Sequence, residues 1–231
     1  SDIFFFDSPF LFLDSFLRDG PSNILVVPHR YSFNRAYLEK RNGIFNAGVT
    51  SFKNTTIGIS CATEWREQCL EYCVNIVFPG PYGDQYYMDY WPTKYPGVMV
   101  FKGKGANAAP WNIRQYSVKK NDGACYLDED PLIFYHFSLL RIYGPHSFRR
   151  FDHSQKRYIN REAKRYIYQP YIRELESIMA KVLNIDPSFE FMRSYEKKPK
   201  YWNNFYHNFK YDIVQIHIRL KKQFPAYEKI F

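Results

Sequence analysis

Short apolar runs that recur through the first 148 residues constrain the fold more than any other feature of this sequence. Turn-rich or helical segments separate them, and the runs are rich in β-branched and aromatic residues. Runs of this kind predict buried strands, and strands that alternate with helices predict an α/β fold. The five predicted strands are residues 3–6, 24–27, 44–52, 98–101 and 132–137.

Segments with a helical repeat lie between and after these runs. Ser8 and Pro9 can cap and begin a short helix that reaches residue 17, and residues 63–73 carry apolar side chains at helical spacing. A second helical pattern covers residues 159–183, with a kink expected at Pro170. Another helix is predicted over residues 205–220.

The charge of the chain is distributed unevenly, and this marks a boundary between two units. Residues 1–148 contain 14 Lys and Arg and 14 Asp and Glu, whereas residues 149–231 contain 18 and 9. The net charge of +9 therefore lies in the last third, beside the turn signal Gly144-Pro145. We expect an α/β unit over residues 1–148 and a basic, aromatic-rich helical extension over residues 149–231.

Hydropathy and cysteine usage predict a soluble cytoplasmic protein. A hydrophobic content of 45% suits one substantial core, and no run approaches the roughly 18 apolar residues that span a bilayer. The first 17 residues lack the basic start and the cleavage site of a secretory signal. The four cysteines form no Cys-x-x-Cys pair and are too few for a disulfide framework, which favours a reducing compartment.

Two features of the predicted strands suit a ligand site. Asp2 directly precedes the first strand. Residues 45–49 read Phe-Asn-Ala-Gly-Val, and Gly48 in this segment allows a ligand to approach the backbone closely. An ordinary turn into a strand is an equal explanation of residues 45–49, and a single carboxylate near a terminus carries little weight alone.

Three further motifs follow along the chain. Asp84 and Gln85 stand at a predicted helix start, where the helix dipole favours an anionic group. Trp111 lies in the segment Ala-Pro-Trp-Asn of residues 109–112, and the last predicted strand delivers His136. Each also has a structural explanation, because Asp is a common N-cap and Trp and His are often core residues. The order of the five motifs carries the interpretation.

In this order, over about residues 1–145, the motifs resemble nucleotide-sugar-dependent glycosyltransferases of the GT-A type, in particular bacterial enzymes similar to glycosyltransferase family 8. The resemblance implies a GT-A-like mixed sheet flanked by helices. It also implies that an Asp directly before Ser1, and the upstream nucleotide-binding half of the fold, are missing from the sequence. The implied residues are Asp2 and His136 as ligands of Mn or Mg, Asp84 and Gln85 as catalytic residues, and Asn46, Ala47, Gly48, Trp111, Asn112 and Arg141 as donor-binding residues.

The chain departs from the family-8 pattern after His136. Family members continue with a Gly and Lys-Pro-Trp, whereas this chain reads Ser-Leu-Leu-Arg over residues 138–141. Arg141 would replace the phosphate-binding Lys, because a guanidinium binds phosphate oxygens in a bidentate way. The implied reaction transfers a sugar from a nucleotide-diphosphate donor, a UDP-sugar, to a glycan or lipid-linked acceptor, with retention of the anomeric configuration.

The basic extension predicts a partner of its own. Its Lys and Arg residues are interleaved with aromatic residues, for example in residues 164–166 and 197–202. Such a surface can dock on anionic lipid headgroups at the inner face of the membrane, or it can be a solvated helical face packed on the catalytic unit.

Two alternative functions remain open at this point. Basic charge with aromatic residues also describes a nucleic-acid-binding module, but the sequence contains no RRM, KH or zinc-finger signature. A glycosyltransferase-like domain that binds carbohydrate without catalysis is the other alternative.

Overall fold

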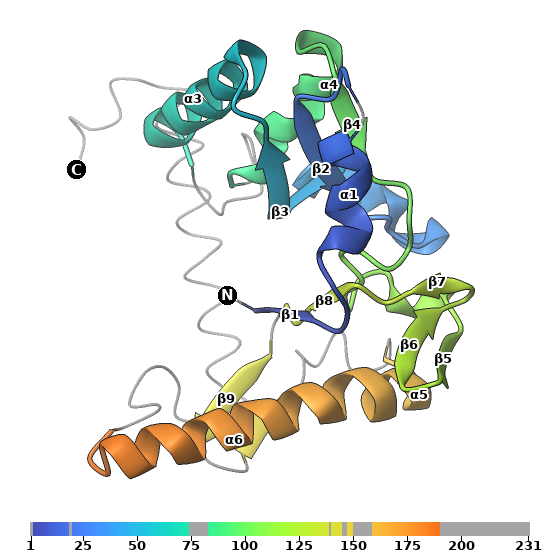
Figure 1. The fold of residues 1–231 in the computed structure, drawn as a ribbon, viewed down its shortest axis with the longest axis vertical. Helices are drawn as coiled ribbons and strands as arrows, with labels where there is room; N and C mark the ends of the chain where they lie inside the picture. Colours follow the sequence, from blue (N-terminus) through green and yellow to red (C-terminus); the bar gives the residue numbers. More distant parts are fainter. Residues whose placement is uncertain are drawn as a thin grey trace, which may run out of the picture.

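The computed structural model has a mixed α/β fold, as the apolar runs predict (Figure 1). It describes residues 2–18, 20–73, 83–138, 140–144, 147–149 and 159–189. Each of the five predicted strands is present, within two residues at either end. Within the described ranges no helix is long and apolar enough to cross a membrane.

A three-stranded mixed sheet consists of β2 (Ile24–Pro28), β3 (Phe45–Phe52) and β4 (Val98–Val100). β2 lies in the middle, antiparallel to β3 and parallel to β4. Its first four residues are buried, because structure covers both faces of the sheet.

Helices cover these two faces because successive side chains of β2 point to opposite sides. The odd-numbered residues of β2 pack against α1 (Phe10–Arg18). The even-numbered residues pack against α3 (Thr56–Glu71), the 3-10 helix η2 (Gln85–Tyr90) and α4 (Trp91–Lys94). Figure 1 shows α1 and α3 on either side of the sheet.

The helix predicted over residues 63–73 begins seven residues earlier than expected, at Thr56. Thr55 is its N-cap, because its hydroxyl accepts a hydrogen bond from the backbone N–H of Gly58 at 3.1 Å. Gly58 also allows the helix to approach the backbone of the preceding segment, since a Cβ there would meet the Lys53 carbonyl at 2.2 Å.

Two strands from opposite ends of the α/β unit form a separate ribbon. β1 (Ile3–Phe5) pairs antiparallel with β8 (Phe134–His136), and Ile3 stands opposite His136. In Figure 1 this ribbon lies between the three-stranded sheet and the long helix α6 (Gln169–Ile185). The pairing brings Asp2 next to the strand that carries His136.

A three-stranded meander was not predicted from the sequence. It contains β5 (Val118–Asn121), β6 (Ala124–Leu127) and β7 (Asp130–Pro131). Three of the four β5 side chains are exposed, so this strand has no apolar run that would identify it. The turn after β5 places Asp122 at φ 48° and Gly123 at φ 85°, as a tight hairpin requires.

The helical pattern over residues 159–183 corresponds to α5 (Arg161–Ala163), a π-helical turn η5 (Lys164–Tyr168) and α6. Pro170 lies in the first turn of α6, where its missing N–H is tolerated. The sequence predicts a kink at Pro170. The irregular part of the helix is instead the π turn over residues 164–168, just before Pro170.

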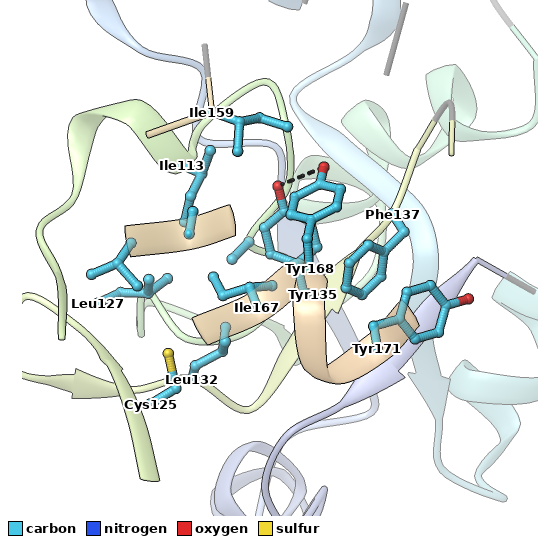
Figure 2. Close-up of a cluster of buried hydrophobic side chains, with 13 residues drawn as sticks. Ile113, Cys125, Leu127, Leu132, Tyr135, Phe137, Ile159, Ile167, Tyr168 and Tyr171 are labelled. Carbon is cyan, nitrogen blue, oxygen red and sulfur yellow. Dashed lines mark hydrogen bonds between the residues drawn. The ribbon is translucent and has the colours of Figure 1, made fainter. Parts of the chain in front are cut away.

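Helices α5 and α6 pack on the α/β unit through one apolar cluster (Figure 2). Tyr135 and Phe137 contribute from the β8 side, and Tyr168 and Tyr171 contribute from the helices. The amino-acid composition changes at residue 148, but the hydrophobic core does not end there, because residues 159–175 share this core with the first unit. The hairpin of β9 (Arg141–Gly144) and β10 (Ser147–Arg149) lies at the same point in the chain.

Most of the predicted basic extension lies outside the described residues. This holds for the helix predicted over residues 205–220 and for the basic aromatic segment at residues 197–202. The basic aromatic segment at residues 164–166 is described. In it, the guanidinium carbon of Arg165 lies over the ring of Tyr166, 5.4 Å from the ring centroid. Tyr166 in turn packs against the cluster beneath it.

Candidate functional site

A cavity of about 370 Å³ brings together four of the ten residues that the sequence motifs identify. Its lining residues come from β3, η2, the region of β8, the loop at Trp111 and the segment of residues 29–42 that follows β2. Four of its lining residues were predicted from the sequence: Asn46, Gln85, Trp111 and His136. The other lining residues are His29, Tyr31, Arg35, Leu38, Arg41, Asn42 and Ser138.

The side-chain amide of Asn46 is the centre of the hydrogen-bond network in this cavity. The backbone N–H of Gly48 can only donate, and it lies 3.1 Å from Asn46 Oδ1, which fixes the orientation of the amide. Nδ2 therefore faces the other way, where it donates to Gln85 Oε1 at 3.1 Å and lies 3.2 Å from His29 Nε2. Asn46 is buried, so these bonds satisfy an amide that has lost contact with water.

The orientation of Asn46 sets the protonation of both histidines. Asn46 Oδ1 can only accept, so His136 Nδ1, 3.2 Å away, carries the proton. On the other side Asn46 Nδ2 donates to His29 Nε2, while His29 Nδ1 donates to the carbonyl of Ile44 at 3.3 Å. His29 is thus a neutral ring, and His136 directs its Nε2 away from Asn46.

Gly48 leaves the space that this network occupies. A Cβ at this position would lie 2.7 Å from Asn46 Oδ1 and 3.1 Å from His136 Nδ1. The glycine in the predicted motif is therefore required by the close approach of two side chains. Ala47, beside it, packs against the core cluster on the α3 face of the sheet and does not line the cavity.

Asp2 and His136 meet at the edge of the cavity, with 3.2 Å between Oδ1 and Nε2. The hydrogen bond from His136 lowers the pKa of Asp2, although partial burial acts in the opposite direction. One carboxylate oxygen and one imidazole nitrogen form a partial donor set for a divalent cation. Within the described part of the chain no group of three or more His, Cys, Asp or Glu residues could complete it. The carboxylate oxygen is a ligand type that Mg and Mn favour, whereas the imidazole nitrogen is not typical of Mg, and two protein donors leave most coordination positions to water or phosphate oxygens.

His29 is a site residue that the sequence motifs missed. It is 2% exposed, and burial lowers its pKa to about 4. Tyr31 stacks on its ring, with centroids 4.8 Å apart and an interplanar angle of 13°, and Trp111 packs edge-on at 5.5 Å. His29 directly follows the β2 strand, and polar residues at the carboxyl ends of strands are frequent ligand residues in α/β folds.

Trp111 and Asn112 have different positions although they are neighbours in one motif. Trp111 lines the cavity, and its ring packs edge-on against His136 with centroids 5.1 Å apart. Asn112 is fully buried, and its amide donates to the carbonyls of His29 and Asn107 at 2.8 and 3.0 Å. Asn112 therefore holds the loop that presents Trp111 and does not face a ligand.

Two of the other predicted residues are not brought into the cavity by the described structure. Asp84 is exposed, and its backbone carbonyl accepts a hydrogen bond from Trp65 Nε1 at 2.9 Å. Its neighbour Gln85 lines the cavity, but Gln85 Nε2 donates to the Asn42 carbonyl at 2.7 Å. The backbone of Arg141 is in β9, and its side chain lies outside the described residues.

A second missed residue, Asp89, fixes the backbone that leads to Asn46. Its carboxylate accepts hydrogen bonds from the N–H groups of Ile44 at 2.8 Å and Phe45 at 3.3 Å. Burial raises the pKa of Asp89, and these two hydrogen bonds oppose that shift. Asp89 thus acts on the site through the start of β3.

The fold and the site together define an α/β protein with a polar, aromatic-walled cavity beside a carboxylate–imidazole pair. The chain is 34% identical over 192 residues to the uncharacterized protein YfnD of Bacillus subtilis strain 168, and 31% identical over 166 residues to the uncharacterized protein YfnF of the same strain. The alignments cover 82% and 71% of this chain, and 60% and 53% of YfnD and YfnF. The chain thus spans little more than half the length of these curated relatives. No family model and no solved structure matches the chain.

Proposed function

We propose that the chain is part of a metal-dependent glycosyltransferase with a GT-A-like fold, which transfers a sugar from a nucleotide-diphosphate donor to a glycan or lipid-linked acceptor. One observation supports this most strongly. Asn46, Gln85, Trp111 and His136 come from four separate segments, were singled out by the glycosyltransferase resemblance, and line one cavity. The pairing of Asp2 with His136 at the edge of this cavity is the second support.

In this proposal Asp2 and His136 hold the divalent cation, Mn or Mg. When bound, the cation supplies charge neutralisation for the departing diphosphate. Asn46 positions His136, because it accepts the Nδ1 proton and turns Nε2 toward Asp2, where the cation would replace the Nε2 proton that bonds the carboxylate in its absence. Trp111 offers an aromatic face to a sugar ring. Gly48 leaves the space in which the side chains of Asn46 and His136 meet.

The first test is calorimetric titration with UDP, in the presence and absence of Mn. We expect binding that requires Mn, that Asp2→Ala abolishes and that Asp7→Ala leaves unchanged, since Asp7 is an exposed carboxylate just beyond β1. UDP binding that is independent of both Mn and Asp2 would contradict the proposal. A parallel titration of YfnD, of which the chain spans 60%, shows whether residues outside the aligned part contribute to the donor site.

A carbohydrate-binding domain without transferase activity is the second candidate. It is favoured by the exposure of Asp84 outside the cavity and by the hydrogen bonds that occupy both ends of the Gln85 amide. Hydrolysis of UDP-sugars distinguishes the two candidates. Slow, Mn-dependent release of UDP supports the transferase, whereas UDP-sugar binding without any turnover supports the binding domain.

A further inference from the structure

One part of the cavity is cationic and is not used by the metal pair. Arg35 and Arg41 line it, and neither Asp nor Glu is among the lining residues. Both arginines belong to the segment from η1 (Phe33–Leu38) to α2 (Glu39–Asn42). Burial keeps His29 neutral, so the positive charge at this part of the cavity comes from guanidinium groups.

Arg41 is held in place by its neighbour Asn42, which in turn is bonded to Tyr31. Its Nε donates to Asn42 Oδ1 at 2.9 Å, and Asn42 Nδ2 donates to the hydroxyl of Tyr31 at 2.9 Å. Within the described ranges Arg41 forms no ion pair with a carboxylate. Its charge is therefore fixed near the cavity and is available to an anion from outside the protein.

Asn46 separates this cationic end from the metal pair. Its Oδ1 faces His136, which contacts Asp2, and its Nδ2 faces Gln85. Gln85 continues away from the metal pair, because its Nε2 donates to the carbonyl of Asn42, the residue next to Arg41. The cavity thus has an acidic edge suited to a cation and a basic end suited to an anion.

We propose that the Arg35–Arg41 end binds a second acidic group of the substrates, a carboxylate or phosphate that is distinct from the donor diphosphate. The inference rests on the proposed function, because that function assigns the diphosphate to the Asp2–His136 edge. The acidic group belongs either to the transferred sugar or to the acceptor, and both sources present the same chemistry. Guanidinium groups suit it because they form paired, charge-assisted hydrogen bonds with carboxylates and phosphates.

Two pairs of matched ligands test this by calorimetry. UDP-glucuronate against UDP-glucose, both with Mn, probes an acidic donor sugar. Glucose 1-phosphate against glucose, without nucleotide or metal, probes an acidic acceptor. We expect at least one acidic ligand to bind about tenfold more tightly than its neutral partner, since one charge-assisted hydrogen bond has that effect.

The variants Arg41→Gln and Arg35→Gln should each remove most of this preference, whereas Lys40→Gln should retain it. Lys40 is the matched control because it is exposed on the same short helix and does not line the cavity. Equal affinity for acidic and neutral ligands overturns the inference, as does an equal loss in Lys40→Gln and Arg41→Gln. If UDP with Mn does not bind but glucose 1-phosphate binds in an Arg41-dependent manner, the proposed function fails and the cationic site stands.

Discussion

The two sides of strand β8 have contrasting environments, one apolar and one polar. Tyr135 is fully buried, and its hydroxyl lies 3.3 Å from that of Tyr168, which Figure 2 shows as a dashed line. Its neighbour His136 points to the other side, into the cavity with Asn46 and Asp2. A single strand therefore separates a packed aromatic core from a polar site, because successive side chains alternate.

The difference teaches that the two faces use different sources of stability. On the aromatic side, Phe137 stacks on Tyr171 with centroids 3.9 Å apart, and burial of such rings is worth several kcal/mol in total. On the cavity side the bonds of Asn46 satisfy a buried polar group and add little net stability. Truncations on the aromatic side should therefore lower stability most, whereas changes on the cavity side should alter binding as well as stability.

The largest expected effect is on the aromatic side, from Tyr168→Ala. Its side chain is fully buried and contacts Tyr135 and Phe137, so truncation should lower the free energy of unfolding by about 3–5 kcal/mol. Urea denaturation followed by far-UV circular dichroism measures the change. Tyr37→Ala is the control, because that ring is 68% exposed and its removal should change stability by less than about 0.5 kcal/mol. Equal effects of the two variants would mean that the helices do not pack as described.

The second effect is a pH dependence that arises on the cavity side, from His29. Its pKa is lowered from 6.5 to about 4 in the folded chain, so between these values the unfolded chain binds more protons. The free energy of unfolding should fall as the pH decreases from about 6.5 to about 4, by up to about 3 kcal/mol in total.

Urea titrations at a series of pH values measure this dependence, and His29→Gln should flatten it over the same window. Tyr168→Phe serves as the control from the aromatic side and should leave the pH dependence as in the parent chain. If the pH dependence of stability persists in His29→Gln, it arises from another titratable group.

The third effect concerns Gly48→Ala. The added Cβ would meet Asn46 Oδ1 at 2.7 Å, so Asn46 or His136 has to move, at a cost of about 1–3 kcal/mol in stability. Because the same two side chains form the site, affinity for UDP with Mn should fall at least about tenfold. Gly20→Ala is the matched control, since a Cβ at that position has no neighbour within 4 Å. Unchanged affinity of Gly48→Ala for UDP with Mn would show that Asn46 and His136 are not part of the donor site.

The same contrast explains which parts of the fold could be predicted from the sequence. β2 is visible because its first four residues form an uninterrupted apolar run and are all buried. The meander is not visible, because β5 reads Val-Lys-Lys-Asn and only Val118 is buried. Its pairing depends on β6 and on the turn at Asp122 and Gly123, and such non-local pairing leaves little periodicity in one strand.

For the site, the resemblance implied ten residues, and four of them line the cavity: Asn46, Gln85, Trp111 and His136. His29 has no comparable local signal. Its burial depends on Tyr31 and on Trp111, which is 82 residues away along the chain. Arg41 cannot be distinguished in the sequence from Lys40 beside it, because only the folded backbone decides which of two exposed basic residues lines the cavity. Residues that act through distant partners are therefore the ones that sequence motifs miss.

The smallest effect on stability and the sharpest separation of the two faces are expected from Asp2→Asn. The Asp2 carboxylate is 53% exposed, so its pairing with His136 should contribute no more than about 1 kcal/mol. The pKa of Asp2 is lowered from 3.8, so this contribution is present above about pH 4 and disappears as the pH falls through the lower folded value. The pH range of the Asp2 effect lies below that of the His29 effect, so one series of urea titrations can distinguish the two contributions to stability.

The same variant should have a large effect on binding. Titration with UDP and Mn should show an affinity at least about tenfold weaker than that of the parent chain, since a charged metal ligand is replaced by a neutral amide. Asp7→Asn controls for the loss of one negative charge near β1 and should change neither property. A stability loss in Asp2→Asn as large as that of Tyr168→Ala, with binding unchanged, would reverse the comparison and make the Asp2–His136 pair a structural contact of the ribbon.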